Sequence, residues 1–161
     1  MKKILGWVFV FLTVAWMVLI FSMSSADSGQ SSGMSRSVDR TVARVIHSDF
    51  DKWESDRQDA FIMKIDHPVR KIAHFSEYTV LGILLITTCR LWGLGPGRSF
   101  LLSFPLGVAY AATDEIHQSF VSGRAGRFTD VLIDGGGVLF GCAAAILVAL
   151  TAASVRRKRA K

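Results

Sequence analysis

Two histidines and five carboxylates stand near the ends of apolar segments of this 161-residue chain. Histidine, Asp and Glu side chains can act as general acids and bases, and they also supply nitrogen and oxygen ligands for divalent metal ions. With their polar neighbours they fall into three groups: Lys71, His74, Glu77 and Tyr78; Asp114, Glu115, His117 and Gln118; and Asp130 with Asp134. Ionisable residues inside a membrane usually face the interior of a helix bundle and serve a function.

The spacing within each group predicts that the three groups meet. On a helix, the four residues of the first group share one face, as do Asp114, His117 and Gln118 of the second. With the first group's lysine at the membrane surface, its histidine lies about 4.5 Å deeper and its glutamate about 9 Å deeper. Asp134 lies about 6 Å deeper than Asp130. Because a charge inside a bilayer costs about 2.5 kcal/mol or more, we expect these residues to pair across helices.

Each residue also has a purely structural interpretation. Asp130 suits the positive end of a helix dipole, and Asp114 could form an interfacial ion pair with Arg124. A hydrogen bond between His74 and Glu77 could simply fix helix packing. Taken together, however, two histidines and five carboxylates at one depth favour a functional site over helix packing alone.

Basic residues near the same end favour a phosphate or pyrophosphate headgroup as the guest. These are Arg70, Lys71, Arg124 and Arg127, and guanidinium groups bind phosphate oxygens in a bidentate manner. A divalent metal could bridge the carboxylates to the same phosphate, but the D-E-x-H order differs from the H-E-x-x-H metal motif. The sequence also lacks a nucleophile elbow and a Walker loop. The cofactor and the question of enzymatic activity therefore stay open.

Four apolar stretches must position these groups: residues 4–21, 72–89, 100–112 and 135–155. A spanning helix needs about 20 mostly apolar residues. We therefore predict one all-α domain over residues 1–161, a four-helix transmembrane bundle with spans near 4–23, 70–90, 99–120 and 130–155. Glycines such as Gly82 and Gly137 would allow the helices to approach closely.

The net charge of +6 is explained by membrane orientation rather than by a nucleic-acid partner. If four helices alternate, one side of the membrane holds nine cations: Lys2, Lys3, Arg90, Arg98, Arg156, Arg157, Lys158, Arg159 and Lys161. Lys and Arg accumulate in short cytoplasmic loops. We therefore expect a multi-pass plasma-membrane protein with both termini in the cytoplasm and the three polar groups on the outer side.

The remaining segments are less informative. The N-terminus resembles a signal peptide, but its 18-residue apolar run exceeds the usual ~7–15 residues and favours a retained anchor. Residues 24–69 are predicted to be extracytoplasmic and mostly helical or irregular, with an amphipathic pattern at Val38, Val42 and Val45. Pro68 is expected to mark the start of the second span. The two cysteines are too few to imply a disulfide framework.

The sequence resembles the VanZ-like family of small bacterial membrane proteins. The resemblance rests on an ordered set of motifs: Arg70-Lys71-x-x-His74-Phe75-x-Glu77-Tyr78, Leu81-Gly82, Asp114-Glu115-Ile116-His117-Gln118-x-Phe120, Gly123-Arg124, Asp130-Val131-Leu132-Ile133-Asp134, and Ile20-Phe21-Ser22-x-Ser24-Ser25. Ser122 stands where the family commonly has a proline. The resemblance implies an integral membrane protein of the cell envelope, and the family is named for a member linked to teicoplanin resistance. It implies no particular reaction.

The combined interpretation is an outward-facing pocket that binds, and in an enzymatic version modifies, a lipid headgroup or lipid-linked envelope precursor. In that version His74, Glu77, Asp114, His117 and Asp134 carry the chemistry, with Glu77 or His117 as base. The binding residues would be Arg70, Lys71, Tyr78, Glu115, Gln118, Arg124 and Asp130. Two alternatives stay open: a non-enzymatic protein that binds a lipid or antibiotic and masks a target, and a proton-coupled transporter.

Overall fold

The computed structural model describes residues 2–25, 28–121 and 126–159. In these ranges the chain forms five α-helices and one 3-10 turn, and it has no strands. The elements are α1 (Lys2–Ser25), α2 (Ser28–Ile46), η1 (Phe50–Lys52), α3 (Ser55–Leu91), α4 (Pro96–Gln118) and α5 (Phe128–Arg159). The all-helical class predicted from the sequence is confirmed.

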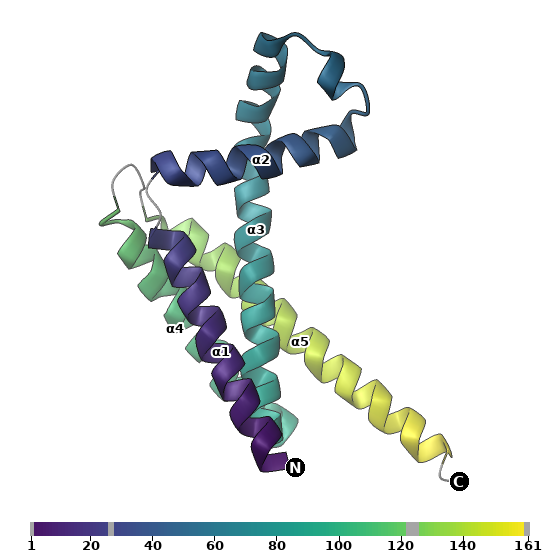
Figure 1. The fold of residues 1–161 in the computed structure, drawn as a ribbon. Helices are drawn as coiled ribbons and strands as arrows, with labels where there is room; N and C mark the ends of the chain where they lie inside the picture. Colours follow the sequence, from purple (N-terminus) through teal and green to yellow (C-terminus); the bar gives the residue numbers. More distant parts are fainter. Residues whose placement is uncertain (1, 26–27, 122–125, 160–161) are drawn as a thin grey trace.

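Helices α1, α3, α4 and α5 form a bundle, and α2 lies across one end of it, roughly perpendicular to α3 (Figure 1). Three helices are long and apolar enough to cross a membrane: Lys3–Ser25, Ser55–Leu91 and Phe128–Arg159. Helix α4 has 23 residues and packs against both α3 and α5. Its mean hydropathy is too low for it to count as a fourth candidate span. The structure thus establishes three candidate spans where the sequence predicts four.

The bundle helices end at recognisable residues. Gly93 has φ 89°, a conformation that suits glycine, and it stops α3. The Leu94 amide donates to the Cys89 carbonyl at 3.2 Å and the Gly93 amide to Arg90 at 3.1 Å, which is the Schellman pattern. Pro96 then begins α4, in a position where its missing N–H costs nothing. This tight connection makes α3 and α4 antiparallel neighbours.

Helix α3 starts much earlier than predicted. It has 37 residues, begins at Ser55 instead of near residue 70, and continues through Pro68. At about 1.5 Å per residue it is about 55 Å long, well beyond the ~30 Å of a bilayer core. Proline inside a helix removes one hydrogen bond. The turns before it are nevertheless held in place, because Ile62 is buried against Ala43 of α2 and Phe50 of η1.

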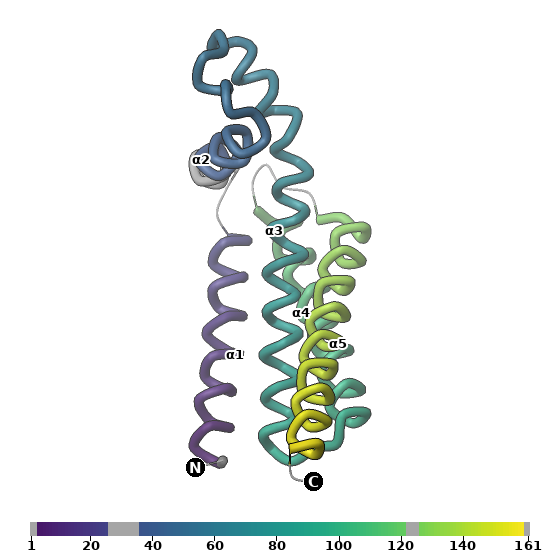
Figure 2. The backbone as a smooth tube through the Cα atoms, turned by 90° about the vertical axis from the view of Figure 1, so that its right-hand side faces the viewer, coloured from purple at the N-terminus to yellow at the C-terminus, as the bar shows by residue number. Residues whose placement is uncertain are grey.

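We call residues 36–65 the head, which α2, η1 and the start of α3 build. Trp53 lies at its centre. The ring centroids of Trp53 and Phe61 are 5.6 Å apart, and the Arg57 guanidinium lies over the Trp53 ring, 4.1 Å from its centroid. The Trp53 indole donates to Asp49 at 3.0 Å, and this hydrogen bond holds the pKa of Asp49 below its usual value. Figure 2 shows the head beyond the ends of the other bundle helices.

Glycines set the closeness of α3 and α5. A Cβ atom on Gly137 would lie 2.4 Å from the Phe75 carbonyl oxygen, and one on Gly141 would lie 2.1 Å from that of Thr79. On α3, a Cβ on Gly82 would lie 2.4 Å from the Val138 carbonyl oxygen. No side chain fits at these three positions, so the predicted role of glycine in close helix packing is confirmed.

The buried core of the bundle is narrow, and many large apolar side chains point outward from the helices and are exposed. Tyr78, Leu81 and Val138 are fully buried, whereas Phe11 and Leu101 are about 70% exposed. Extensive exposed apolar surface is unusual for a soluble monomer and marks a membrane or partner interface. This surface is the one that a lipid environment would cover.

Candidate functional site

The three polar groups of the sequence lie at one end of the bundle. This end contains the last turn of α1, the segment of α3 around residues 71–78, the last turn of α4 and the first turns of α5 (Figures 1 and 2). We call the side chains gathered there the polar cluster: Ser24, Ser25, Lys71, His74, Glu77, Tyr78, Asp114, Glu115, His117, Gln118, Asp130 and Asp134. The expected meeting of the groups is therefore observed.

Asp114 connects α4 to α1. Ser24 donates to its Oδ2 atom at 2.8 Å, and Gln118, one turn further along α4, donates to the same atom at 3.0 Å. All three residues are buried, and Asp114 is only 1% exposed. Its Oδ1 atom has no hydrogen-bond partner among the described residues. One carboxylate oxygen thus holds α1 and α4 together, and the Tyr78 hydroxyl of α3 lies beside the same carboxyl group.

His117 contacts the very end of α1. Its Nε2 atom lies 3.0 Å from the Ser25 hydroxyl, and its ring stacks on Phe21 with centroids 4.3 Å apart. Ser25 already donates its single hydrogen to the Phe21 carbonyl at 2.7 Å. Nε2 must therefore be the donor in this contact, so His117 does not act here as a base that activates the Ser25 hydroxyl.

A salt bridge between Lys71 and Asp130 joins α3 to α5 near the rim of the cluster. The side chains of both residues are about three-quarters buried. Arg70, predicted as a second rim cation, points elsewhere. Its guanidinium pairs with Asp66 at 2.6 Å, one turn earlier on the same helix. Arg70 and Lys71 thus pair in different directions, because consecutive helical residues point about 100° apart. The binding role of Arg70 stays a prediction.

His74 and Glu77 are neighbours on α3. The His74 Nδ1 atom lies 3.9 Å from a Glu77 carboxylate oxygen, and both side chains are about four-fifths buried. The indole of Trp16 on α1 donates to the Glu77 backbone carbonyl at 2.9 Å. This bond fixes α1 against α3 beside the cluster.

Glu115 binds the segment that leads into α5. Its Oε2 atom accepts a hydrogen bond from the Arg127 backbone amide at 2.9 Å. Gly126 allows this approach, because a Cβ atom there would lie 2.3 Å from the Glu115 carbonyl oxygen. Arg124, predicted to hold a phosphate, and its possible pair with Asp114 lie outside the described residues.

Asp134 and Tyr78 form the innermost part of the cluster. Asp134 is 1% exposed and Tyr78 is fully buried. Within the described ranges, neither Asp134 carboxylate oxygen has a hydrogen-bond partner. The Tyr78 hydroxyl lies beside the Asp114 carboxyl group, to which it can donate. Asp134 also lies within electrostatic range of four charged side chains: Glu115, Asp114, Glu77 and Lys71. The only cation among these is already paired with Asp130.

The sequence left open whether a divalent metal is bound. Across residues 2–25, 28–121 and 126–159, no three His, Cys, Asp or Glu donors converge as a metal would require. Structural and catalytic metal sites normally offer three or more protein ligands.

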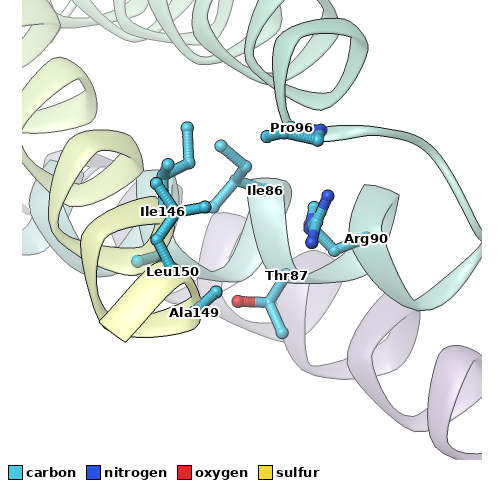
Figure 3. Close-up of a pocket in the computed structure, with 8 residues that line it drawn as sticks. Ile86, Thr87, Arg90, Pro96, Ile146, Ala149 and Leu150 are labelled. Atoms are coloured by element: carbon cyan, nitrogen blue, oxygen red, sulfur yellow. The ribbon is translucent and has the colours of Figure 1, made fainter. Parts of the chain in front are cut away.

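A separate pocket lies toward the other end of the bundle (Figure 3). Ile86, Thr87 and Arg90 of α3, Pro96, and residues 145–150 of α5 line it. Its volume is about 120 Å³, smaller than the ~300 Å³ or more that ligand pockets usually have. Its lining is almost entirely apolar, and it contains none of the predicted site residues.

Sequence reasoning missed the contribution of α1. Ser24, Ser25 and Trp16 all hydrogen-bond to predicted site residues or to their backbone. A signal was available for the two serines, since they form part of the motif at the end of the first apolar stretch. No comparable signal marked Trp16, which reads as one more apolar residue of the span.

The fold and the cluster define a class, a helical membrane protein that encloses carboxylates at one end of its bundle. Residues 9–149 match the family VanZ/LLP1, and the chain belongs to that family. The resemblance drawn from the motifs is confirmed. No curated protein and no solved structure gives a significant match to the chain.

Proposed function

We propose that this protein crosses the plasma membrane four times and uses the polar cluster to bind the headgroup of a lipid or lipid-linked envelope precursor. One observation carries the proposal. Asp134 is buried in an apolar bundle, and the described residues leave both of its carboxylate oxygens without a hydrogen-bond partner. Buried polar groups nearly always have partners, and an unsatisfied one costs about 1–3 kcal/mol. A bound guest would supply the missing partners.

Charge supports the orientation of this site toward the outside. The end of the bundle opposite the cluster carries Lys3, Arg90 and Arg98, and the basic residues 156–159 end α5. Cytoplasmic loops are rich in Lys and Arg. In this orientation both termini are cytoplasmic, the head is extracytoplasmic, and α4 is the fourth crossing despite its lower hydropathy.

The rim residues suit a phosphate. Lys71 is partly exposed at the rim of the cluster, where a phosphate can share its ammonium with Asp130. Arg127, whose backbone amide donates to the Glu115 carboxylate, is exposed and adds a second cation nearby. In an enzymatic version, Glu77 is the better candidate base, because the Nε2 atom of His117 donates to Ser25.

Photo-crosslinking tests the binding proposal. A phospholipid with a photoreactive group beside its phosphate is incorporated into nanodiscs with the purified protein, and labelled peptides are mapped. Labelling should concentrate on residues 71–78 and 127–134, and Asp114→Asn should reduce it. Asp59→Asn, an exposed change on α3 outside the cluster, is the matched control. Uniform labelling along the lipid-facing helices would contradict a headgroup site.

A cellular assay tests the link to the envelope. Cells that lack the native protein are complemented with the wild type, Glu77→Gln, Asp114→Asn or Asp59→Asn, and teicoplanin susceptibility is measured at matched expression. The first two variants should behave like the empty vector, and the control should behave like the wild type. Full protection by Glu77→Gln and Asp114→Asn would contradict both the enzymatic and the masking versions.

A second candidate, proton-coupled transport, is favoured by the enclosure of Asp134. A proton needs no cavity, and carboxylates inside membranes commonly relay protons. Proteoliposomes containing a trapped pH-sensitive dye would reveal proton movement. Movement that depends on Asp134 would favour this candidate over headgroup binding.

A further inference from the structure

The pocket between α3 and α5 lies where α5 leaves the bundle, at the end opposite the polar cluster. Figure 1 shows α5 crossing α3 and then diverging from the other helices toward its C-terminal end. Ile86 and Arg90 of α3 line one side of the pocket, and Ala145 and Leu150 of α5 line the other. The divergence of the two helices therefore leaves a space on the lipid-facing side of the bundle.

The pocket is apolar inside and positively charged at its edge. Measured from this end of the bundle, Ile86 lies one turn, about 6 Å, deeper than Arg90, and Ala145 lies about 7.5 Å deeper than Leu150. Arg90 is exposed and lies beside Pro96, across the pocket from Leu150 (Figure 3). A phospholipid has the same order along its length, with a charged phosphate outermost and an apolar chain further in.

The positive charge at this end is not compensated by acidic residues of the same segments. Residues 2–25, 79–113 and 135–159 build this part of the bundle, and they contain no Asp or Glu. The Arg90 guanidinium donates to the Leu94 carbonyl at 3.3 Å, but it has five N–H donors in all. Basic pockets between membrane helices on the cytoplasmic side bind anionic lipid headgroups. The charge at the edge of the pocket is thus complementary to a lipid phosphate.

The size of the pocket suits part of a lipid chain. Its volume of about 120 Å³ is too small to enclose a whole ligand. A lipid needs only part of one acyl chain inside, because the rest of the molecule stays in the bilayer. Leu147 and Val148 lie on the same turns of α5 and are more than 60% exposed, so they add apolar surface for lipid beside the pocket.

We propose that this pocket binds one anionic phospholipid, with its phosphate on Arg90 and part of an acyl chain between Ile86 and Ala149. In the orientation proposed above, the lipid belongs to the cytoplasmic leaflet. The site is separate from the polar cluster and goes beyond the proposed function. The lipid would also link the diverging end of α5 to α3.

Native mass spectrometry of the purified protein in neutral detergent tests this proposal. The protein is titrated with phosphatidylglycerol or with phosphatidylcholine of the same chains, and the dissociation constant of each successive lipid is measured. We expect the first phosphatidylglycerol to bind about fivefold or more tightly than the second, and more tightly than the first phosphatidylcholine by a similar factor. Successive lipids of equal affinity would show ordinary surrounding lipid and overturn the site.

Two arginine variants test the charge. Arg90→Gln should weaken binding of the first phosphatidylglycerol about fivefold. Arg98→Gln removes the same charge from an exposed position at the same end that does not line the pocket, and it should change binding by less than about twofold. Equal weakening in both variants would show that only the general charge attracts the lipid, and it would overturn the site.

Two alanine variants on α5 test the space. Ala149→Phe fills the pocket without changing its charge and should weaken the first phosphatidylglycerol about fivefold or more. Ala143→Phe adds the same bulk at an exposed position outside the pocket and should change binding by less than about twofold. Both alanines are exposed, so neither variant has to repack the core. Unchanged binding in Ala149→Phe would overturn the placement of the chain.

Two further arms identify the source and the place of the lipid. Glycerophosphoglycerol, the headgroup without its chains, should not bind measurably, and binding as tight as that of the lipid would overturn the lipid source. Asp134→Asn in the polar cluster should retain the first phosphatidylglycerol. Its loss in this variant would place the lipid at the polar cluster, which would overturn this inference and support the proposed function.

Discussion

At the scale of single residues, Asp134 holds the most unusual position in the molecule. It is 1% exposed, and its two carboxylate oxygens find no hydrogen-bond donor among the described residues. Such a group costs stability, and proteins keep costly groups at functional sites. Ser24 is the opposite case, because it donates to Asp114 and joins two helices.

We expect Asp134→Asn to stabilise the protein in the absence of ligand. The amide has the same shape, carries no charge and can donate to neighbouring carboxylates, so a gain of about 1 kcal/mol or more is expected. Unfolding in detergent measures it. The exposed change Asp59→Asn should stay within about 0.5 kcal/mol of the wild type. A clear loss of stability in Asp134→Asn would show that this carboxylate holds the bundle together.

The Lys71–Asp130 pair should be energetically coupled. A double-mutant cycle with Lys71→Met and Asp130→Asn should give about 1–3 kcal/mol, because the pair is mostly buried and removing one partner leaves a charge uncompensated. Arg44 and Asp51 in the head form the matched control. Both are more than half exposed, so their coupling should stay below about 1 kcal/mol. Equal coupling in the two pairs would argue against a buried link between α3 and α5.

At the scale of elements, the contact of α3 with α5 positions the cluster. Gly82, Gly137 and Gly141 bring the two backbones so close that no side chain fits between them. This contact fixes Asp130 and Asp134 beside Lys71 and Tyr78. Helix α1 completes the cluster from the other side through Ser24 and Ser25.

Two neighbouring glycines should therefore respond differently to alanine. Gly137→Ala places a Cβ 2.4 Å from the Phe75 carbonyl oxygen and should destabilise the bundle by about 1–3 kcal/mol. At Gly136 the nearest atom is a Phe75 ring carbon 3.7 Å away, an ordinary contact. Gly136→Ala should be neutral or stabilising by up to about 1 kcal/mol, because alanine favours helix. The free energies of unfolding of both variants are measured in the same detergent, and equal changes in the two variants would contradict the observed packing.

At the scale of the whole molecule, the exposed apolar surface and the charge of the terminal segments support the proposed orientation in a membrane. The cluster and the head lie at one end, and the other end carries Lys3, Arg90, Arg98 and the basic residues 156–159. Among the described residues only three helices qualify as spans by length and composition, so the crossing by α4 is the part of the topology that most needs a direct measurement.

Cysteine accessibility provides that measurement. With Cys89 and Cys142 replaced, a single cysteine is introduced at the exposed Gly97 at the start of α4 or at the exposed Ser119 directly after α4. A membrane-impermeant maleimide should label Ser119→Cys in intact cells and Gly97→Cys only after permeabilisation. Labelling of both cysteines from the same side would exclude the proposed crossing by α4. Labelling of Gly97→Cys in intact cells and of Ser119→Cys only after permeabilisation would invert the orientation.

Much of this arrangement could be predicted without coordinates. The helices predicted near residues 4–23, 99–120 and 130–155 agree with α1, α4 and α5 to within four residues at each end. The i, i+3 and i+4 spacing also predicted which polar residues share a helix face. The start of α3 was missed because Pro68 normally marks a helix boundary, and tertiary contacts of Ile62 with the head overrode that local preference. The ion pair of Arg70 with Asp66, one turn earlier on the same helix, was not predicted, because side-chain rotamers depend on the folded surroundings.

The amino-acid sequence by itself determined the helical class, the family, the membrane-compatible apolar surface and the three polar groups, since hydropathy, charge and motif order are local properties of the chain. Only the tertiary structure decided which polar atoms pair and which stay unsatisfied. That depends on distances between helices that are far apart in sequence, such as Ser24 and Asp114, and on the glycine contacts that set those distances. A free carboxylate at Asp134 is therefore a property of the packed bundle.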